Sequence, residues 1–138
     1  MKTYRESIRQ YELLSAHDPG SSSLRVREGI AYLALSLEYD HMKDGAATLD
    51  AASRARTIFR EPILNANIGA RQLLARADYE AGNGYALQGN WIAAHQSYRE
   101  SVDLWHDIKA KDQLPGNGAV RTAEAEKGLA ESEKHLPR

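Results

Sequence analysis

Apolar and small side chains recur in this chain at alternating steps of three and four residues. The clearest run consists of Trp91, Ala94, Tyr98, Ser101, Trp105 and Ile108. Steps of this size place the residues along one side of an α-helix, and such a stripe has to be buried against a partner. The spacing therefore predicts helices that pack against one another.

Turn signals divide the chain into helical lengths. The signals are Asp18-Pro19-Gly20, Asp44-Gly45, Glu61-Pro62, Gly89-Asn90 and Pro115-Gly116-Asn117-Gly118, and residues of these types end helices. The predicted helices span about 3–15, 24–43, 46–60, 64–88, 91–109 and 118–135. Because the connections are short, neighbouring helices should run antiparallel. We therefore predict an all-α fold of stacked antiparallel hairpins with about six helices.

Composition narrows the class of protein. The 138 residues suit a single domain, and 18 Lys+Arg against 19 Asp+Glu leave no basic excess for nucleic acid or an anionic membrane. Without cysteine, the chain has neither disulfides nor thiolate metal ligands. No stretch approaches the ~20 apolar residues that cross a bilayer, and residues 1–6 lack a signal peptide's apolar run. We expect a cytoplasmic protein with no nucleic-acid or membrane partner.

A short internal repeat indicates a periodic architecture. The pentapeptide at residues 4–8 recurs at residues 98–102 with Val102 in place of Ile8, displaced by 98 − 4 = 94 residues. A middle copy would set the period at about 47 residues, which falls in the range of helical repeat arrays. Superposing the turns at Gly45 and Gly89 gives an offset of 44 residues.

One stretch carries a recognisable pattern of small and aromatic residues on two successive helices. The pattern is Ala81, Gly82 and Tyr85, then a turn at Gly89, then Trp91, Ala94 and Tyr98. It resembles the signature of the tetratricopeptide-repeat (TPR) family. Gly82 and Ala94 would let the two helices approach closely. Asp78 stands where the family usually has tryptophan.

The resemblance implies a single TPR-like domain over residues 1–138. Residues 1–17 would be the lone second helix of a hairpin, 22–60 and 62–110 two hairpins, and 118–136 a C-terminal capping helix. The ending, a Pro-Gly loop and an acidic helix, is similar to the C-terminal region of some bacterial serine/threonine protein kinases. That similarity implies that the chain is a fragment of a larger signalling protein. The chain itself contains none of the kinase's catalytic motifs.

The sequence offers no constellation for catalysis, cofactor binding or metal binding. The five histidines occur in no pattern that places two ligands on one helix face, such as His-Glu-x-x-His. There is also no Gly-x-Ser-x-Gly motif, phosphate-binding loop or dinucleotide fingerprint. We therefore expect no enzyme activity, no cofactor and no metal.

A binding surface is the remaining expectation. In TPR arrays the first helix of each hairpin lines a concave groove that holds an extended peptide or a partner helix. With the offset of 44 residues, Arg76, Tyr79 and Asn83 align with a stripe that includes Tyr32 and Tyr39. Tyrosine and arginine anchor interfaces because they bury a large area and keep a polar end. We predict that these five residues bind the partner; alternatively, the stripe packs on a neighbouring helix.

The leading functional prediction is a protein–protein interaction scaffold that binds a peptide or partner helix in this groove. A structural self-association or spacer module is the second possibility, since a truncated repeat array exposes an unpaired hairpin. A small-ligand sensor is the third, and it is supported only by the tyrosine-lined groove.

Overall fold

The computed structural model describes residues 3–137, and every regular element in that range is helical. The elements are α1 (Tyr4–His17), α2 (Ser22–His41), α3 (Gly45–Phe59), the short 3-10 helix η1 (Pro62–Leu64), α4 (Ile68–Leu87), α5 (Trp91–Ala110) and α6 (Gly118–Lys134). The predicted all-α class is confirmed. Residues 1, 2 and 138, which the predicted domain includes, lie outside the described residues.

Polar side chains determine where most of the helices begin. Each of five N-cap residues accepts a hydrogen bond from the backbone N–H three residues further on: Thr3, Ser21, Asp44, Asn67 and Asn90. Such a cap satisfies one of the N–H groups that a helix start leaves without a partner. The caps explain why α4 begins at Ile68, after Asn67, and not at residue 64 as expected.

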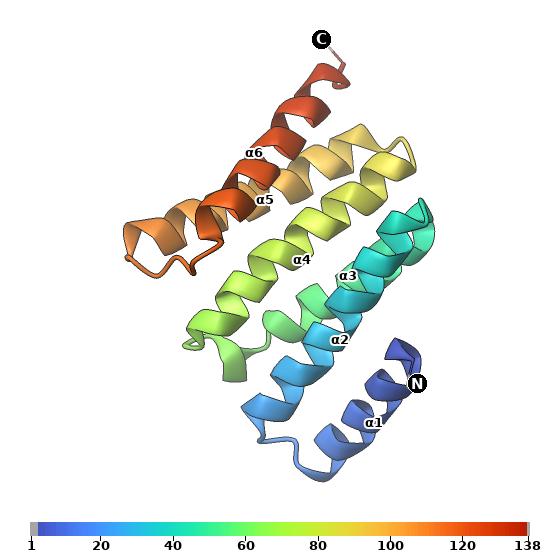
Figure 1. The fold of residues 1–138 in the computed structure, drawn as a ribbon, viewed down its shortest axis with the longest axis vertical. Helices are drawn as coiled ribbons and strands as arrows, with labels where there is room; N and C mark the ends of the chain where they lie inside the picture. The colour runs from blue at the N-terminus through green and yellow to red at the C-terminus, as the bar shows by residue number, and fades with distance from the viewer. Residues whose placement is uncertain (1–2, 138) are drawn as a thin grey trace.

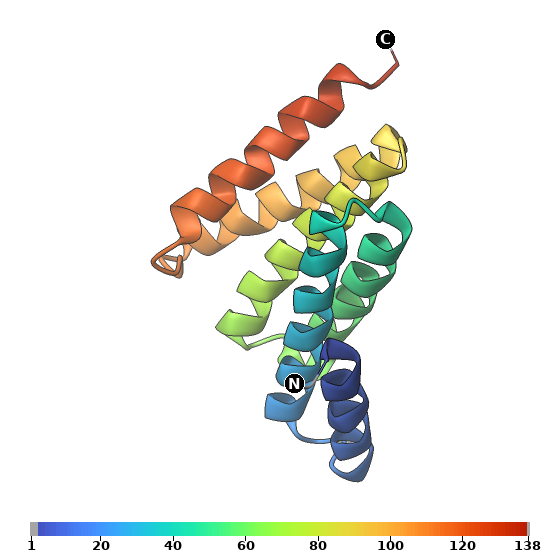
Figure 2. The ribbon, with the colours of Figure 1, turned by 45° about the vertical axis from the view of Figure 1, so that its right-hand side comes forward.

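The even-numbered helices form one layer and the odd-numbered helices the other. Along the chain each helix packs against the next, and α2 also contacts α4, as α4 contacts α6. Figure 1 shows α2, α4 and α6 side by side, with α3 and α5 partly behind them. In the turned view of Figure 2, α1 stands at one end of the stack and α6 at the other. The even layer therefore presents one continuous face.

The two central hairpins repeat every 46 residues, because α2 and α4 begin at residues 22 and 68, and 68 − 22 = 46. The expected offset of 44 is two residues short. Its cause is the turn of the first hairpin, where Lys43 takes the left-handed conformation (φ 60°) that Gly89 takes in the second (φ 75°). Gly45 serves a different purpose as the first residue of α3, since a Cβ there would lie 2.9 Å from the Cβ of Leu87.

The core consists of two clusters of buried apolar residues. One surrounds Phe59 and Leu64 and draws on α1 to α4, and the other surrounds Trp105 and Ile108 between α4, α5 and α6. Fully buried alanines such as Ala52 let the helices approach closely. No helix within residues 3–137 has both the length and the apolar character that crossing a membrane requires.

A buried ion-pair network around Asp78 joins α3, α4 and α5. Asp78, 2 % exposed, lies 2.8 Å from Arg56 Nε and 3.3 Å from Arg60. Glu100 on α5 pairs with both arginines, at 2.8 and 3.1 Å. Burial raises the pKa of Asp78 to about 7, against the opposing effect of the two arginines. Ionic contacts thus take part in the packing between these three helices.

Candidate functional site

The face of the even-numbered layer is hollowed by a groove of about 630 Å³, which we call the inner groove. Its walls come from α2, α4 and α6, and the N-terminal half of α5 contributes Trp91 and Tyr98. On α4 the lining residues Tyr79, Glu80 and Asn83 follow one another at steps of one and three. Asn83 therefore lies about one turn beyond both Tyr79 and Glu80, on the part of α4 that lines the groove between α2, α6 and Tyr98 of α5.

A chain of hydrogen bonds crosses the floor of the inner groove. The Tyr98 hydroxyl donates to Asn83 Oδ1 at 2.5 Å, and Asn83 Nδ2 donates to Asp40 Oδ2 at 3.2 Å. The ring of Tyr79 lies against that of Tyr98, with the centroids 5.7 Å apart. The chain fixes the Asp40 carboxyl of α2 over α4, beside the carboxyl of Glu80.

Glu80 is the buried acid of this groove. It is 4 % exposed, and its Oε2 is buried without a hydrogen-bond partner among residues 3–137. Burial, and after it the nearby Asp40 carboxyl, raise the pKa of Glu80 to about 8, while Asn83 and Arg76 act in the opposite direction. A buried polar atom without a partner costs about 1–3 kcal/mol. Such an atom in a groove points to a group that binds there.

Arg76 lies one turn before Glu80 on α4, in a narrow extension of the groove that Arg121 and Glu124 also line. No hydrogen bond or ion pair between described residues holds its half-buried guanidinium. Burial, and then the neighbouring Arg121, lower the pKa of Arg76 from its usual value. Arg121 itself lies 3.6 Å from Glu124. Among the described residues, the inner groove and its extension therefore hold a buried carboxyl oxygen without a hydrogen-bond partner and a guanidinium without an ion-pair partner.

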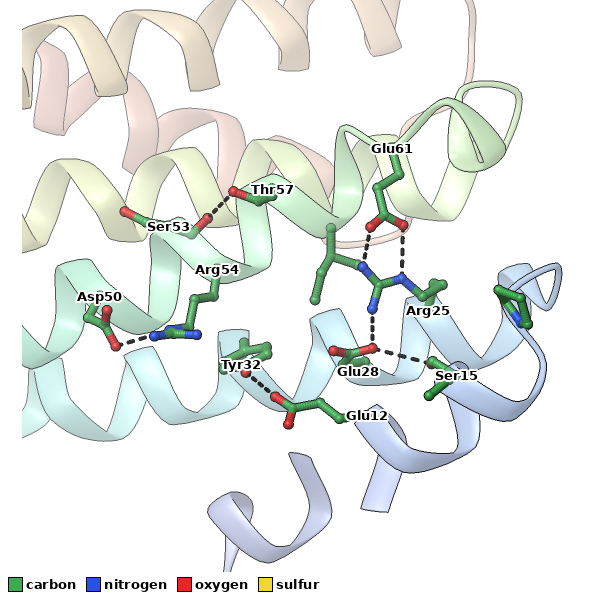
Figure 3. Close-up of a pocket in the computed structure, with 13 residues that line it drawn as sticks. Glu12, Ser15, Arg25, Glu28, Tyr32, Asp50, Ser53, Arg54, Thr57 and Glu61 are labelled. Atoms are coloured by element: carbon green, nitrogen blue, oxygen red, sulfur yellow. Dashed lines mark hydrogen bonds and ion pairs between the residues drawn. The ribbon is translucent and has the colours of Figure 1, made fainter. Parts of the chain in front are cut away.

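A second hollow of about 900 Å³, which we call the outer furrow, lies between α1 and α3 over α2. Figure 3 shows its polar side chains joined to one another. Arg25 forms ion pairs with Glu61 and Glu28, and Glu28 also accepts a hydrogen bond from Ser15 at 3.3 Å. At the other end the Tyr32 hydroxyl donates to Glu12 at 2.6 Å, and Arg54 pairs with Asp50 at 3.3 Å. The charged groups of the outer furrow thus satisfy one another.

The structure separates the five residues that the sequence predicted as a single binding surface. Arg76, Tyr79 and Asn83 line the inner groove or its extension. Tyr32 lies in the outer furrow, and Tyr39 lines a smaller hollow that adjoins it. Tyr32 is 8 % exposed, and the Tyr39 hydroxyl accepts a hydrogen bond from Arg5 of α1. This arrangement favours the alternative in which the Tyr32/Tyr39 stripe packs on a neighbouring helix.

The difference of two residues in the repeat offset accounts for this separation. With the observed period of 46, Arg76, Tyr79 and Asn83 correspond to Ile30, Leu33 and Leu37 on α2. Leu37 lines the inner groove, and Leu33 and Leu37 both line its extension. The apolar stripe of Val26, Ile30, Leu33 and Leu37 is therefore the part of α2 that corresponds to the groove residues of α4.

Sequence reasoning missed Asp40, Glu80 and Tyr98 as groove residues. A signal existed for Glu80, because it stands four residues after Arg76 and one after Tyr79, on the face already predicted to line the groove. Asp40 had no comparable signal, since its neighbour Glu80 is brought to it only by the contact of α2 with α4. Within the described chain, no group of three or more histidine or acidic side chains is placed to hold a metal ion.

Comparisons with protein-family models, with curated proteins and with solved structures give no match to this chain.

Proposed function

We propose that this chain is a protein–protein interaction module that holds a segment of its partner in the inner groove. The observation that carries the proposal is the contrast between the two hollows. The polar groups of the outer furrow pair with one another, whereas the inner groove leaves Glu80 Oε2 and Arg76 without direct partners. Groups of this kind gain most from a ligand that supplies the missing contacts.

The residues around these groups are of the types that anchor protein interfaces. Tyr79, Trp91 and Tyr98 line the inner groove, and Arg76 lines its extension. Aromatic and arginine side chains dominate binding energy at interfaces because they bury a large area and offer directed polar contacts. The even-numbered helices supply most of this lining, as the first helices of TPR hairpins do, which supports the proposal that the chain is TPR-like. A role in bacterial signalling is part of the same proposal and rests on the resemblance alone.

The test compares two substitutions that each place an arginine in a hollow. Ala86→Arg fills the inner groove, and Ser53→Arg places the same side chain in the outer furrow as a matched control. Proteins bound by the wild-type chain in lysate from the source cells would be quantified by mass spectrometry beside both variants, after circular dichroism confirms their folding. We expect Ala86→Arg to lose the partner and Ser53→Arg to keep it.

Two results would count against the inner groove. Loss of the partner with Ser53→Arg alone would move the interface to the outer furrow. Equal binding by both variants, or no partner for the wild-type chain, would remove the groove from consideration as an interface.

Self-association is the second candidate function, and one observation on α1 favours it. Leu13 and Leu14 are 60 % and 49 % exposed on the side of α1 that no other helix covers. Burying exposed leucines against a second copy would contribute roughly 25 cal/mol for each Å² of apolar surface removed from water. A molar mass that rises with concentration in sedimentation equilibrium, and that Leu13→Glu returns to the monomer value, would support this function.

A further inference from the structure

We propose that the inner groove recognises a cationic side chain, a lysine or an arginine of the bound segment, through the paired carboxyls of Asp40 and Glu80. This inference rests on the proposed function, because it assumes that a partner segment lies in the groove. It adds the chemistry of that segment.

The two carboxyls have too few donors for their number of oxygens. Within the described part of the chain, the Asn83 amide donates to Asp40 at 3.2 Å, the carboxyls of Asp40 and Glu80 lie within hydrogen-bond reach of each other, and Glu80 Oε2 receives no hydrogen bond. Arg76 is on the same helix as Glu80 but is not within ion-pair distance of it. An ionised carboxyl can accept about four hydrogen bonds. A lysine ammonium offers three donors and an arginine guanidinium five, so either would supply what is missing.

Glu80 differs from the exposed acids of the groove because its side chain is buried. It is 4 % exposed, its partnerless oxygen is buried, and the side chain lines both the inner groove and its extension. Burying an acid without a donor is costly, so an apolar or amide side chain would be expected here if the site were purely structural. A role in binding a cation explains why position 80 is a glutamate.

The surroundings of the two carboxyls also suit a positive charge. The rings of Tyr79 and Tyr98 line the same groove, and Tyr79 is the more accessible of the two, because Gly82 and Gly128 pack closely against the Tyr98 ring. Burial raises the pKa of both phenols. Ring faces attract lysine and arginine heads by about 0.5–2 kcal/mol. Four acids line the inner groove, Asp40, Glu80, Glu124 and Glu131, against the bases Arg121 and Lys127, with Arg76 as a third base in the extension. Once Glu80 is ionised, the acids therefore outnumber these bases by one, and a bound cation would balance that charge.

When no partner is bound, a proton between the carboxyls of Asp40 and Glu80 supplies the positive charge that a cation would otherwise bring. Because the pKa of Glu80 is raised to about 8, its carboxyl is largely protonated at neutral pH and the pair avoids a double negative charge. Binding of a lysine or arginine would displace that proton. A segment that instead offered a carboxylate would have to use Arg76 and Arg121, and Glu124 beside Arg121 opposes that choice.

The experiment begins with a random peptide library displayed on phage and selected on the wild-type chain. We expect the selected peptides to be enriched in lysine or arginine at one position. A selected peptide would then be synthesised twice, once as found and once with norleucine in place of its lysine (or citrulline for arginine). Because a hydrogen bond to a charged group contributes about 1.5–3 kcal/mol, calorimetry should show about ten- to hundredfold weaker binding for the neutral peptide.

Glu80→Gln and Glu131→Gln make the matched pair on the protein side. Both remove one carboxylate from the groove lining, but Glu131 is an exposed residue at its edge. Glu80→Gln should bring the affinities of the two peptides together, and Glu131→Gln should preserve most of the difference. Asp40→Asn is the second variant, and it should act like Glu80→Gln if that substitution disturbs folding.

The possible failures separate this inference from the proposed function. Peptides that bind without a preferred cation, or a neutral peptide that binds as tightly as the charged one, would overturn the inference and leave the proposed function standing. Enrichment of acidic residues or of a free C-terminal carboxylate would also overturn it and point to Arg76 and Arg121. If no peptide is enriched over selection on Ala86→Arg, the groove does not bind peptides and both proposals fail.

Discussion

Gly82→Ala should destabilise this protein although it improves the helix propensity of α4. Alanine is favoured over glycine by about 1 kcal/mol inside a helix. A Cβ at position 82 would, however, lie 2.6 Å from Cδ1 of the Tyr98 ring, where carbon atoms in contact are normally about 3.5–4.0 Å apart. The ring cannot withdraw towards α6, because a Cβ built on Gly128 would lie 2.7 Å from its Cε1. Overpacking of this kind costs about 1–3 kcal/mol.

Gly69→Ala on the same helix is the control that separates the two effects. Gly69 is exposed, and the nearest atom to a Cβ there is Asn67 Oδ1 at 3.3 Å. The variant should be neutral or up to about 1 kcal/mol more stable. Urea unfolding followed by circular dichroism should therefore find Gly82→Ala less stable than Gly69→Ala by about 1–3 kcal/mol.

A double-mutant cycle with Tyr98 tests whether the Tyr98 ring causes the loss of stability in Gly82→Ala. Tyr98→Leu makes room beside α4, so the penalty of Gly82→Ala should shrink in that background, and the two changes should be coupled rather than additive. If Gly82→Ala proves as stable as Gly69→Ala, the ring is free to move and the close packing of α4, α5 and α6 around Tyr98 is wrongly described.

Three further measurements test other parts of the structure. Lys43→Gly should raise the free energy of unfolding by about 1 kcal/mol, because glycine takes the left-handed conformation without strain; an unchanged urea midpoint would contradict this. The folded-state pKa values of Glu80, about 8, and Asp78, about 7, lie above those of the unfolded chain. The folded protein therefore keeps protons that the unfolded chain has released, so stability should fall as the pH rises from about 4 to about 8, and Glu80→Gln should flatten the upper part of that fall. Tyr98→Phe removes the donor to Asn83 and should cost about 1 kcal/mol in thermal unfolding, whereas no loss would mean that water replaces the hydroxyl.

The helical class could be predicted from the sequence because its signals are local. Steps of three and four between apolar residues predict which face of a helix is buried, and Asp44-Gly45 or Gly89-Asn90 predict where a helix ends. Neither prediction needs information about any other segment of the chain. The boundary at residues 62–67 was less accurate, because the 3-10 turn that follows Pro62 is set by how Leu64 packs into the core. Local signals give the elements, and packing adjusts their ends.

The register between hairpins was harder to predict because two kinds of glycine look alike in a sequence. Gly89 is needed for a positive φ, whereas Gly45 is needed for close approach to Leu87. Aligning them shifted the repeat by two residues and selected the stripe of Tyr32 and Tyr39 on α2. The identification of all five predicted residues as partner-binding stays a prediction, but those on α4 line the inner groove and its extension, whereas Tyr32 and Tyr39 line a separate hollow on the other side of α2.

The candidate site also shows why a pair of interacting acids is difficult to find from sequence alone. Asp40 and Glu80 lie 40 residues apart in the chain, and each by itself is an ordinary helical acid. Their meeting depends on the contact of α2 with α4 and on the depth at which Glu80 is buried, neither of which the spacing of residues reports. Whether a carboxyl lacks a hydrogen-bond partner depends on the structure that surrounds it. The same sequence position would be harmless on the surface, and it becomes a candidate binding site only because three helices enclose it and leave its oxygen without a donor.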